Sequence, residues 1–161
     1  MNPNEAVDRL DTFITEGRLI RNKWIGTDGE GRELACLLAA LAPQCGEQED
    51  ASVCPADLMP PWLADLTPWI DDAGSEEAWL GVVRRYASLA HRWSILDATA
   101  WRRCEIAVKR ACVSEALSYV PASEPWGVRA ACEEVIAWLD SGAPMDGRGA
   151  AEAAAWAAEA A

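Results

Sequence analysis

Two pairs of carboxylates in the chain have a spacing that could hold a magnesium ion. Glu30 and Glu33 lie three residues apart, as do Asp8 and Asp11, so both members of a pair would share one face of a helix. Mg²⁺ prefers such oxygen ligands and also binds phosphate. Neither pair has a matching set on a second amphipathic segment, so helix capping and solvated faces are the favoured explanation.

The six cysteines do not have the spacing of a zinc site. Zinc ligands usually come in pairs separated by about two to four residues, and the nearest cysteines here are eight positions apart. Those on apolar helical stripes are predicted to be core residues: Cys36, Cys104, Cys112 and Cys132. Cys45 and Cys54 flank an acidic stretch and are expected to be exposed thiols, with a regulatory disulfide as the less favoured alternative.

The single histidine and the glycine-rich stretch carry no catalytic signature. His91 lies near the end of a predicted helix, where an imidazole interacts well with the helix dipole, so we favour a structural role. Three glycines, at 26, 29 and 31, fit neither a P-loop nor a dinucleotide-binding fingerprint. We therefore predict no catalytic set, no metal site and no cofactor.

Charge is the strongest pattern in the sequence. The formal net charge is -12, yet residues 44–80 hold nine acidic and no basic residues, whereas residues 81–112 hold seven basic and two acidic ones. We expect the basic helices to pair with the acidic segments on either side, in surface ion pairs worth about 0–1 kcal/mol each. The alternative is that the acidic block stays unpaired and attracts a basic partner.

A direct nucleic-acid site on the basic segment is disfavoured. Seven basic residues recur along two predicted helices: Arg84, Arg85, Arg92, Arg102, Arg103, Lys109 and Arg110. Phosphate contacts need such groups on one face. The acidic charge of the whole molecule opposes approach to DNA or RNA, and no nucleic-acid-binding motif accompanies the segment.

Apolar residues at helical spacing, punctuated by Pro and Gly, predict helices almost throughout. The predicted helices begin near residues 3, 33, 57, 75, 97, 123 and 149. Residues 18–32 are predicted to form a loop, with a short hairpin as the alternative, and Thr27 to Glu30 has capping-box spacing for the helix that follows. Residues 44–56 are predicted to be a solvated loop. We expect an all-α fold, a compact single-domain bundle of about five to seven short helices over residues 1–161.

The ends of individual helices give further expectations. Asn2 or Asn4, Asp57, Ser75 and Asp97 are candidate N-caps, and whether Pro68 kinks or ends its helix stays open. Residues 84–110 are expected to form a helical hairpin with five side chains turned inward: Trp79, Tyr86, Trp93, Trp101 and Val108. The alanine-rich helix over 149–161 is expected to be peripheral or cut short.

The function expected from these patterns is non-enzymatic binding. The chain has no apolar run of bilayer length and its N-terminus lacks the features of a signal peptide, so the cytoplasm is the default compartment. The favoured hypothesis is an acidic helical protein that occupies a basic, nucleic-acid-handling protein, in the manner of phage-encoded inhibitors of nucleic-acid-cutting defences such as anti-CRISPR proteins. This rests on an analogy of size, charge and fold class.

Two other classes remain as alternatives. An immunity or antitoxin-like protein that neutralises one basic toxin would show the same charge and the same alanine-rich tail. A magnesium-dependent, all-α nucleotide hydrolase would need Glu30, Glu33 and further carboxylates to converge on the metal. We expect no direct nucleic-acid or membrane partner, and the sequence does not predict an oligomeric state.

The predicted partner-binding residues are carboxylates of the acidic block with an aromatic anchor beside them. They are Glu47, Glu49, Asp50, Asp71, Asp72, Glu76 and Glu77, together with Trp62 and Trp69.

Overall fold

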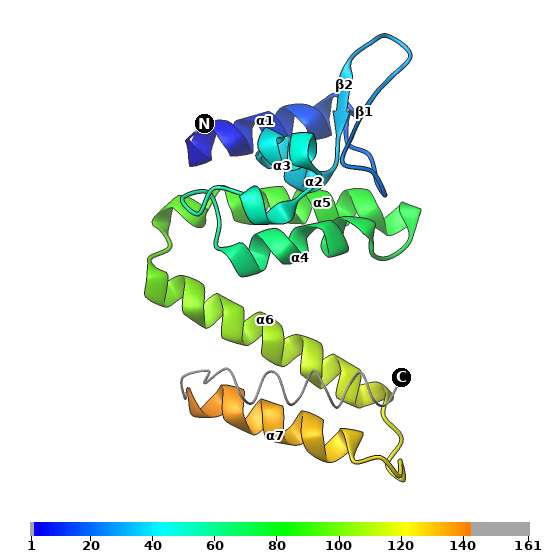
Figure 1. Ribbon diagram of the computed structural model, residues 1–161, viewed down its shortest axis with the longest axis vertical. Helices are drawn as coiled ribbons and strands as arrows, with labels where there is room; N and C mark the ends of the chain where they lie inside the picture. Colours follow the sequence, from blue (N-terminus) through cyan, green and yellow to red (C-terminus); the bar gives the residue numbers. More distant parts are fainter. Residues whose placement is uncertain (1, 143–161) are drawn as a thin grey trace. The chain divides into compact units, whose positions relative to one another are not determined.

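The computed structural model describes residues 2–142 of the 161-residue chain. Within them lie seven α-helices and one two-stranded sheet, so the fold is all-α apart from this small sheet, as expected (Figure 1). The chain divides into two compact units, the first ending at Trp101 and the second beginning at Arg102. The single domain expected over 1–161 stays a prediction, and the helix expected over 149–161 lies outside the described residues.

The first helix, α1 (Pro3–Thr15), begins where its capping signals lie. The Asn2 side chain accepts a hydrogen bond from the Glu5 N–H, and the Glu5 carboxylate accepts one from the Asn2 N–H. This reciprocal capping box satisfies backbone donors that the first turn leaves free. The helix buries one face, made of Ala6, Val7, Leu10 and Phe13.

The segment after α1 forms a short hairpin, which was the alternative to the predicted loop. Strands β1 (Ile25–Thr27) and β2 (Glu33–Ala35) pair antiparallel. The prediction that Thr27 caps a helix is wrong, because Thr27 lies within β1. Asp28 organises the turn instead, since its Oδ1 accepts hydrogen bonds from the backbone N–H groups of Glu30 and Arg32.

Helix α2 (Leu37–Leu41) therefore starts later than predicted, with the Cys36 thiol as its cap, 3.4 Å from the Ala39 nitrogen. All five residues of α2 are buried, as physical chemistry requires of a helix that is apolar on every side. Such a short helix gains little from its own hydrogen bonds, so its stability comes from burial.

The stretch predicted to be a solvated loop, residues 44–56, is largely helical. It contains α3 (Pro43–Gln48) and the 3₁₀ turn η1 (Ala51–Val53). Gly46 explains why α3 packs so closely on its neighbours: a Cβ there would lie 2.6 Å from the Ile25 side chain and 2.8 Å from that of Ala39. This packing buries Cys45 completely, so the expectation of an exposed Cys45 thiol is wrong.

Helices α4 (Pro61–Asp72) and α5 (Glu76–Ala90) complete the first unit. Pro60 and Pro61 begin α4, so Asp57 does not cap it, and Pro68 lies inside the helix without ending it. Ser75 caps α5 as predicted, because its hydroxyl accepts the Ala78 N–H. Helix α5 buries a narrow stripe that includes Trp79, Val83 and Tyr86, whereas Val82 and Leu89 are exposed.

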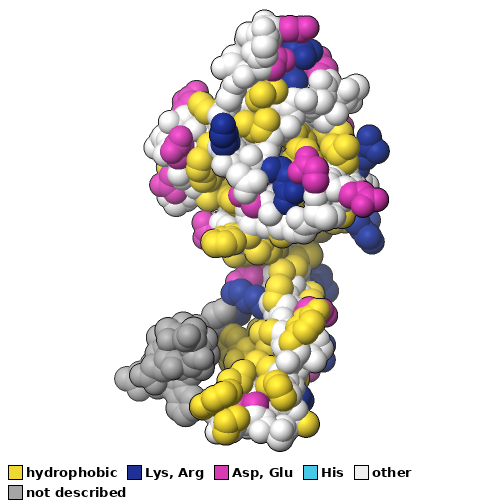
Figure 2. Space-filling model, turned by 90° about the vertical axis from the view of Figure 1, so that its right-hand side faces the viewer, with side chains coloured by type: hydrophobic (Ala, Val, Ile, Leu, Met, Phe, Trp, Pro, Cys, Tyr) yellow, Lys and Arg dark blue, Asp and Glu magenta, His cyan; other side chains and the backbone are white. Residues whose placement is uncertain are grey.

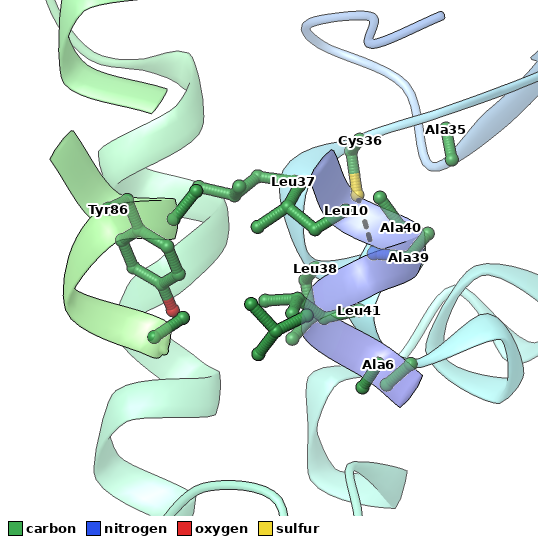
Figure 3. Close-up of a cluster of buried hydrophobic side chains, with 14 of the residues drawn as sticks. Ala6, Leu10, Ala35, Cys36, Leu37, Leu38, Ala39, Ala40, Leu41 and Tyr86 are labelled. Carbon is green, nitrogen blue, oxygen red and sulfur yellow. Dashed lines mark hydrogen bonds between the residues drawn. The ribbon is translucent and has the colours of Figure 1, made fainter. Parts of the chain in front are cut away.

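One hydrophobic core joins the helices of the first unit. In Figure 3 the leucines of α2 lie between Tyr86 of α5 and the ribbon of α1. Trp79 and Trp93, the latter in the 3₁₀ turn η2 (Trp93–Ile95), are also buried as predicted. Trp101 is half-buried and packs on Trp93 at 6.0 Å between ring centroids.

Helix α6 (Ala98–Tyr119) begins in the first unit, where Asp97 caps it as predicted through a 2.7 Å hydrogen bond from the Ala100 N–H.

Helix α7 (Val128–Ser141) starts later than expected. The Glu124 carboxylate precedes it and accepts the N–H groups of Trp126 and Arg129. Gly142 closes α7, with a left-handed φ of 66°.

The second unit buries few of its described side chains. Leu139 is buried in α7, whereas none of the residues of α6 is. Figure 2 shows apolar side chains at the surface of these helices, on the face it draws. Of the four cysteines predicted to be core, Cys36 is buried, Cys104 and Cys132 are half-buried, and Cys112 is exposed. The prediction for Cys112 is therefore wrong.

Candidate functional site

The acidic block of residues 44–80 lies on α3, η1, α4 and the start of α5, all in the first unit. Only one of its nine carboxylates makes an ion pair within the part of the chain that the structure describes. This pair joins Glu76 to Arg21, at 3.3 Å between Oε2 and Nη1. The block therefore keeps most of its negative charge unpaired.

The basic segment does not neutralise this block. Arg84, Arg85 and Arg92 of the first unit are exposed and make no ion pair among the described residues. In the second unit, Arg102 and Lys109 pair with Glu105 of their own helix. The expectation of pairing with the flanking acidic segments holds for Arg110, whose Nε lies 2.7 Å from Asp140 Oδ1. It is wrong for the three arginines of the first unit, for Arg102 and Lys109, and for Arg103, which makes no ion pair among the described residues.

Asp71, a predicted contact residue, is a buried anchor. It is 1% exposed; its Oδ2 accepts the Leu37 N–H at 2.9 Å and its Oδ1 accepts the Trp79 indole N–H at 2.8 Å. Burial raises the pKa of its carboxyl group, an effect that outweighs the opposing influence of these two hydrogen bonds. Asp71 cannot contact a partner from this position, so this prediction is corrected.

Asp72 and Glu76 are exposed, but both have local partners around Arg21. The Arg21 guanidinium donates to the carbonyl oxygens of Asp71, Asp72, Ala73 and Gly74 at the end of α4, the shortest bond being 2.7 Å to Asp72. Asp72 Oδ1 accepts the Asn22 N–H, also at 2.7 Å. Arg21 thus caps α4, since a cation there satisfies free carbonyls and complements the helix dipole.

The sequence analysis missed Arg21 because its partners are about fifty residues away along the chain. No local spacing connects an arginine in a loop with the end of a distant helix.

Three predicted contact residues are exposed carboxylates that make no ion pair in the described structure: Glu47, Glu49 and Glu77. Asp50 is exposed too, but it caps η1, accepting both the backbone N–H and the hydroxyl of Ser52 at 2.8 Å. The Ser52 N–H holds the pKa of Asp50 below its usual value. Asp57 and Asp65 are also exposed, and the prediction had omitted them.

The two predicted aromatic anchors differ in their surroundings. Trp62 is half-buried and packs edge-on against Trp101, with ring centroids 6.3 Å apart. Trp69 lies on the outer face of α4 and is 75% exposed. An indole this exposed contributes little to the core. Of the two predicted anchors, Trp69 is therefore the one that is free to contact a partner.

His91, the buried Cys45 and the half-buried Cys54 have structural surroundings. His91 Nε2 lies 2.8 Å from Asp11 Oδ2, which links the end of α5 to α1. Burial raises the pKa of Cys45 to about 12 and also raises that of Cys54. Neither thiol therefore forms the reactive thiolate readily at neutral pH.

The two glutamates of the candidate carboxylate pair Glu30 and Glu33 are paired with arginines. Glu33 pairs with Arg9 at 2.8 Å, and Glu30 with Arg32 at 3.4 Å. Residues 2–142 contain no group of three or more His, Cys, Asp or Glu side chains placed to hold a metal ion. Among the same residues, no helix has the length and apolarity needed to cross a bilayer.

Comparisons with known proteins return nothing similar. No family model, no curated protein and no solved structure matches the chain.

Proposed function

We propose that this protein is a non-enzymatic binding protein whose acidic block occupies a basic surface on another protein. The observation that supports this most directly is the block itself, in which one carboxylate of nine makes an ion pair among the described residues. A folded protein that needed these charges only for its own stability would pair or cap more of them. Asp71 and Asp50 are carboxylates of the block that do stabilise the fold, since Asp71 accepts the Leu37 N–H and Asp50 caps η1.

The partner class that we propose is a nucleic-acid-handling protein, which the acidic protein masks or inhibits, as phage-encoded inhibitors do. Proteins that bind DNA or RNA present lysines and arginines to an array of phosphates. A surface of fixed carboxylates offers the same sign of charge, and its field accelerates association more than it tightens the complex. An inhibitor acting in this way competes with nucleic acid for its target.

The test is affinity capture from a lysate of the source organism, at about 50 mM and about 500 mM salt, with the captured proteins identified by mass spectrometry. We expect a basic nucleic-acid-binding protein that is retained at low salt and displaced by added DNA or RNA. Reversing the charge of Glu47, Glu49 and Glu77 to lysine should abolish its capture.

The matched control reverses the charge of Glu115, Glu133 and Glu134, three exposed carboxylates of the second unit. Equal loss in both triple variants would indicate a general effect of net charge and would contradict the proposal. Capture of one toxin, with no competition by nucleic acid, would favour the immunity-protein alternative.

A further inference from the structure

The outer face of α4 combines an exposed indole with two exposed carboxylates. Asp65 precedes Trp69 by four residues and Asp72 follows it by three. Residues three and four apart are neighbours on a helix surface, so the two carboxylates lie along one side of the indole. The residues that α4 buries, Leu63 and Thr67 among them, occupy the opposite face.

Trp62 and Leu66 extend this face toward the start of α4. Both are half-buried, and with Trp69 they have the spacing i, i+4, i+7 of a single apolar ridge. Seven residues of helix span about 10 Å. The outer face of α4 thus carries an apolar ridge beside an acidic one. Trp69 is the exposed member of the ridge, whereas Trp62 and Leu66 are partly covered.

No cation of the protein itself occupies this face in the described structure. The arginines that stack on aromatic rings do so elsewhere: Arg9 and Arg18 lie over Phe13, and Arg21 lies over Trp79. Arg21, which lies at the end of α4, donates its hydrogen bonds to the carbonyl groups there and to Glu76. Residues 44–80 contain no lysine or arginine.

We propose that the outer face of α4 binds an arginine side chain of the partner protein, within a basic amphipathic segment whose apolar residues contact Trp62 and Leu66. A planar guanidinium stacks on an indole face and donates hydrogen bonds to carboxylates beside it, two contacts that an ammonium group combines less well. Asp72 Oδ2 is available for this, since Asn22 uses only Oδ1. This inference rests on the proposed function and specifies how the basic partner is recognised.

The experiment uses a fluorescently labelled amphipathic peptide with arginines at i, i+4 spacing and leucines on its other face, and a matched peptide with lysine at every arginine position. Binding to the full chain is followed by fluorescence anisotropy at about 50 mM salt. We expect the arginine peptide to bind more tightly, Trp69→Ala to weaken it about tenfold, and Asp65→Asn to weaken it about threefold.

The matched control is Trp126→Ala, because Trp126 is 73% exposed but belongs to the second unit. Its binding of the arginine peptide should equal that of the wild type. Urea unfolding of each variant shows that its fold is intact, which we expect because Trp69, Asp65 and Trp126 are all exposed.

Several outcomes overturn the inference. They are equal binding of the two peptides, binding by Trp69→Ala that is within about twofold of wild type, equal loss in Trp126→Ala, and no binding of either peptide. A dimer in sedimentation velocity that dissociates on Trp69→Ala also overturns it, because the occupant would be a second copy. If Trp69→Ala still captures the basic protein from lysate, this site fails while the proposed function stands.

Discussion

The two faces of α4 have similar kinds of residue and different roles. Asp71 on the inner face is buried and accepts hydrogen bonds from two other elements, whereas Asp65 on the outer face is exposed and makes no ion pair in the described structure. Thr67 is buried and hydrogen-bonded, whereas Trp69, two residues later, is 75% exposed. Substitutions on the two faces can therefore test stability and the proposed binding independently.

The inner face of α4 connects the central helix with α5 through polar groups. Asp71 binds the first residue of α2 and the Trp79 indole of α5. The Thr67 hydroxyl donates its single hydrogen to the Leu63 carbonyl oxygen at 2.7 Å, so the Tyr86 hydroxyl must be the donor in the 2.6 Å contact between them. These bonds satisfy polar groups that would otherwise be costly to bury.

The largest expected effect is that of Asp71→Ala. This substitution leaves the Leu37 N–H and the Trp79 indole N–H buried without an acceptor, and each unsatisfied donor costs about 1–3 kcal/mol. We expect the free energy of unfolding in urea to fall by about 3 kcal/mol. Asp65→Ala on the outer face should leave it unchanged, and equal destabilisation by both would remove the distinction between the faces.

Leu63→Ala should come next. Leu63 is 8% exposed and packs into the core, and truncating a buried leucine costs about 2–5 kcal/mol through lost burial and the cavity left behind. We expect the free energy of unfolding in urea to fall by about 2 kcal/mol, because the side chain retains some exposure. Leu66→Ala, on the outer ridge, should cost clearly less; the reverse order would show that the outer ridge is part of the core.

Tyr86→Phe is a smaller change on the same inner face. It removes the buried hydroxyl that donates to Thr67, so we expect a loss of about 1 kcal/mol in urea unfolding. The matched control is Tyr119→Phe, because the Tyr119 hydroxyl also donates to a side chain, Glu115, but the residue is 77% exposed. A loss as large at Tyr119 as at Tyr86 would argue against burial as the cause.

The smallest expected effect is a dependence of stability on pH that comes from Asp71. Its pKa is raised above the ordinary value of 3.8, so the folded state holds this proton more tightly than the unfolded state. The stability it contributes is fully present below that ordinary pKa and is lost as pH rises through the raised one. Carboxylates with lowered pKa values, such as Asp28, act in the opposite sense.

The measurement is the difference between wild type and Asp71→Asn, taken from urea unfolding at a series of pH values. The wild type should lose stability relative to the variant as the pH rises from about 4. A difference that stays constant with pH, or that grows in favour of the wild type, would contradict the raised pKa.

Much of the helical architecture could be predicted from local patterns. The caps at Asn2, Ser75 and Asp97 lie where the sequence indicates. Each depends on contacts within three or four residues, which is the range over which a sequence pattern carries information. The concentration of acidic residues in the acidic block could be predicted for the same reason, because it is a property of one continuous segment.

The sequence by itself determined the class of fold, the caps at Asn2, Ser75 and Asp97, and the separation of charge along the chain. The tertiary structure decided which carboxylates are structural and which are free. Asp71 is buried because α2, thirty-four residues earlier, places a backbone N–H beside it, and α4 is capped by an arginine fifty residues earlier. Likewise, residues 25–35 form a hairpin and residues 43–48 a buried helix because packing against α2 outweighs local propensity. Contacts between distant segments fix these roles, and no spacing in the sequence records them.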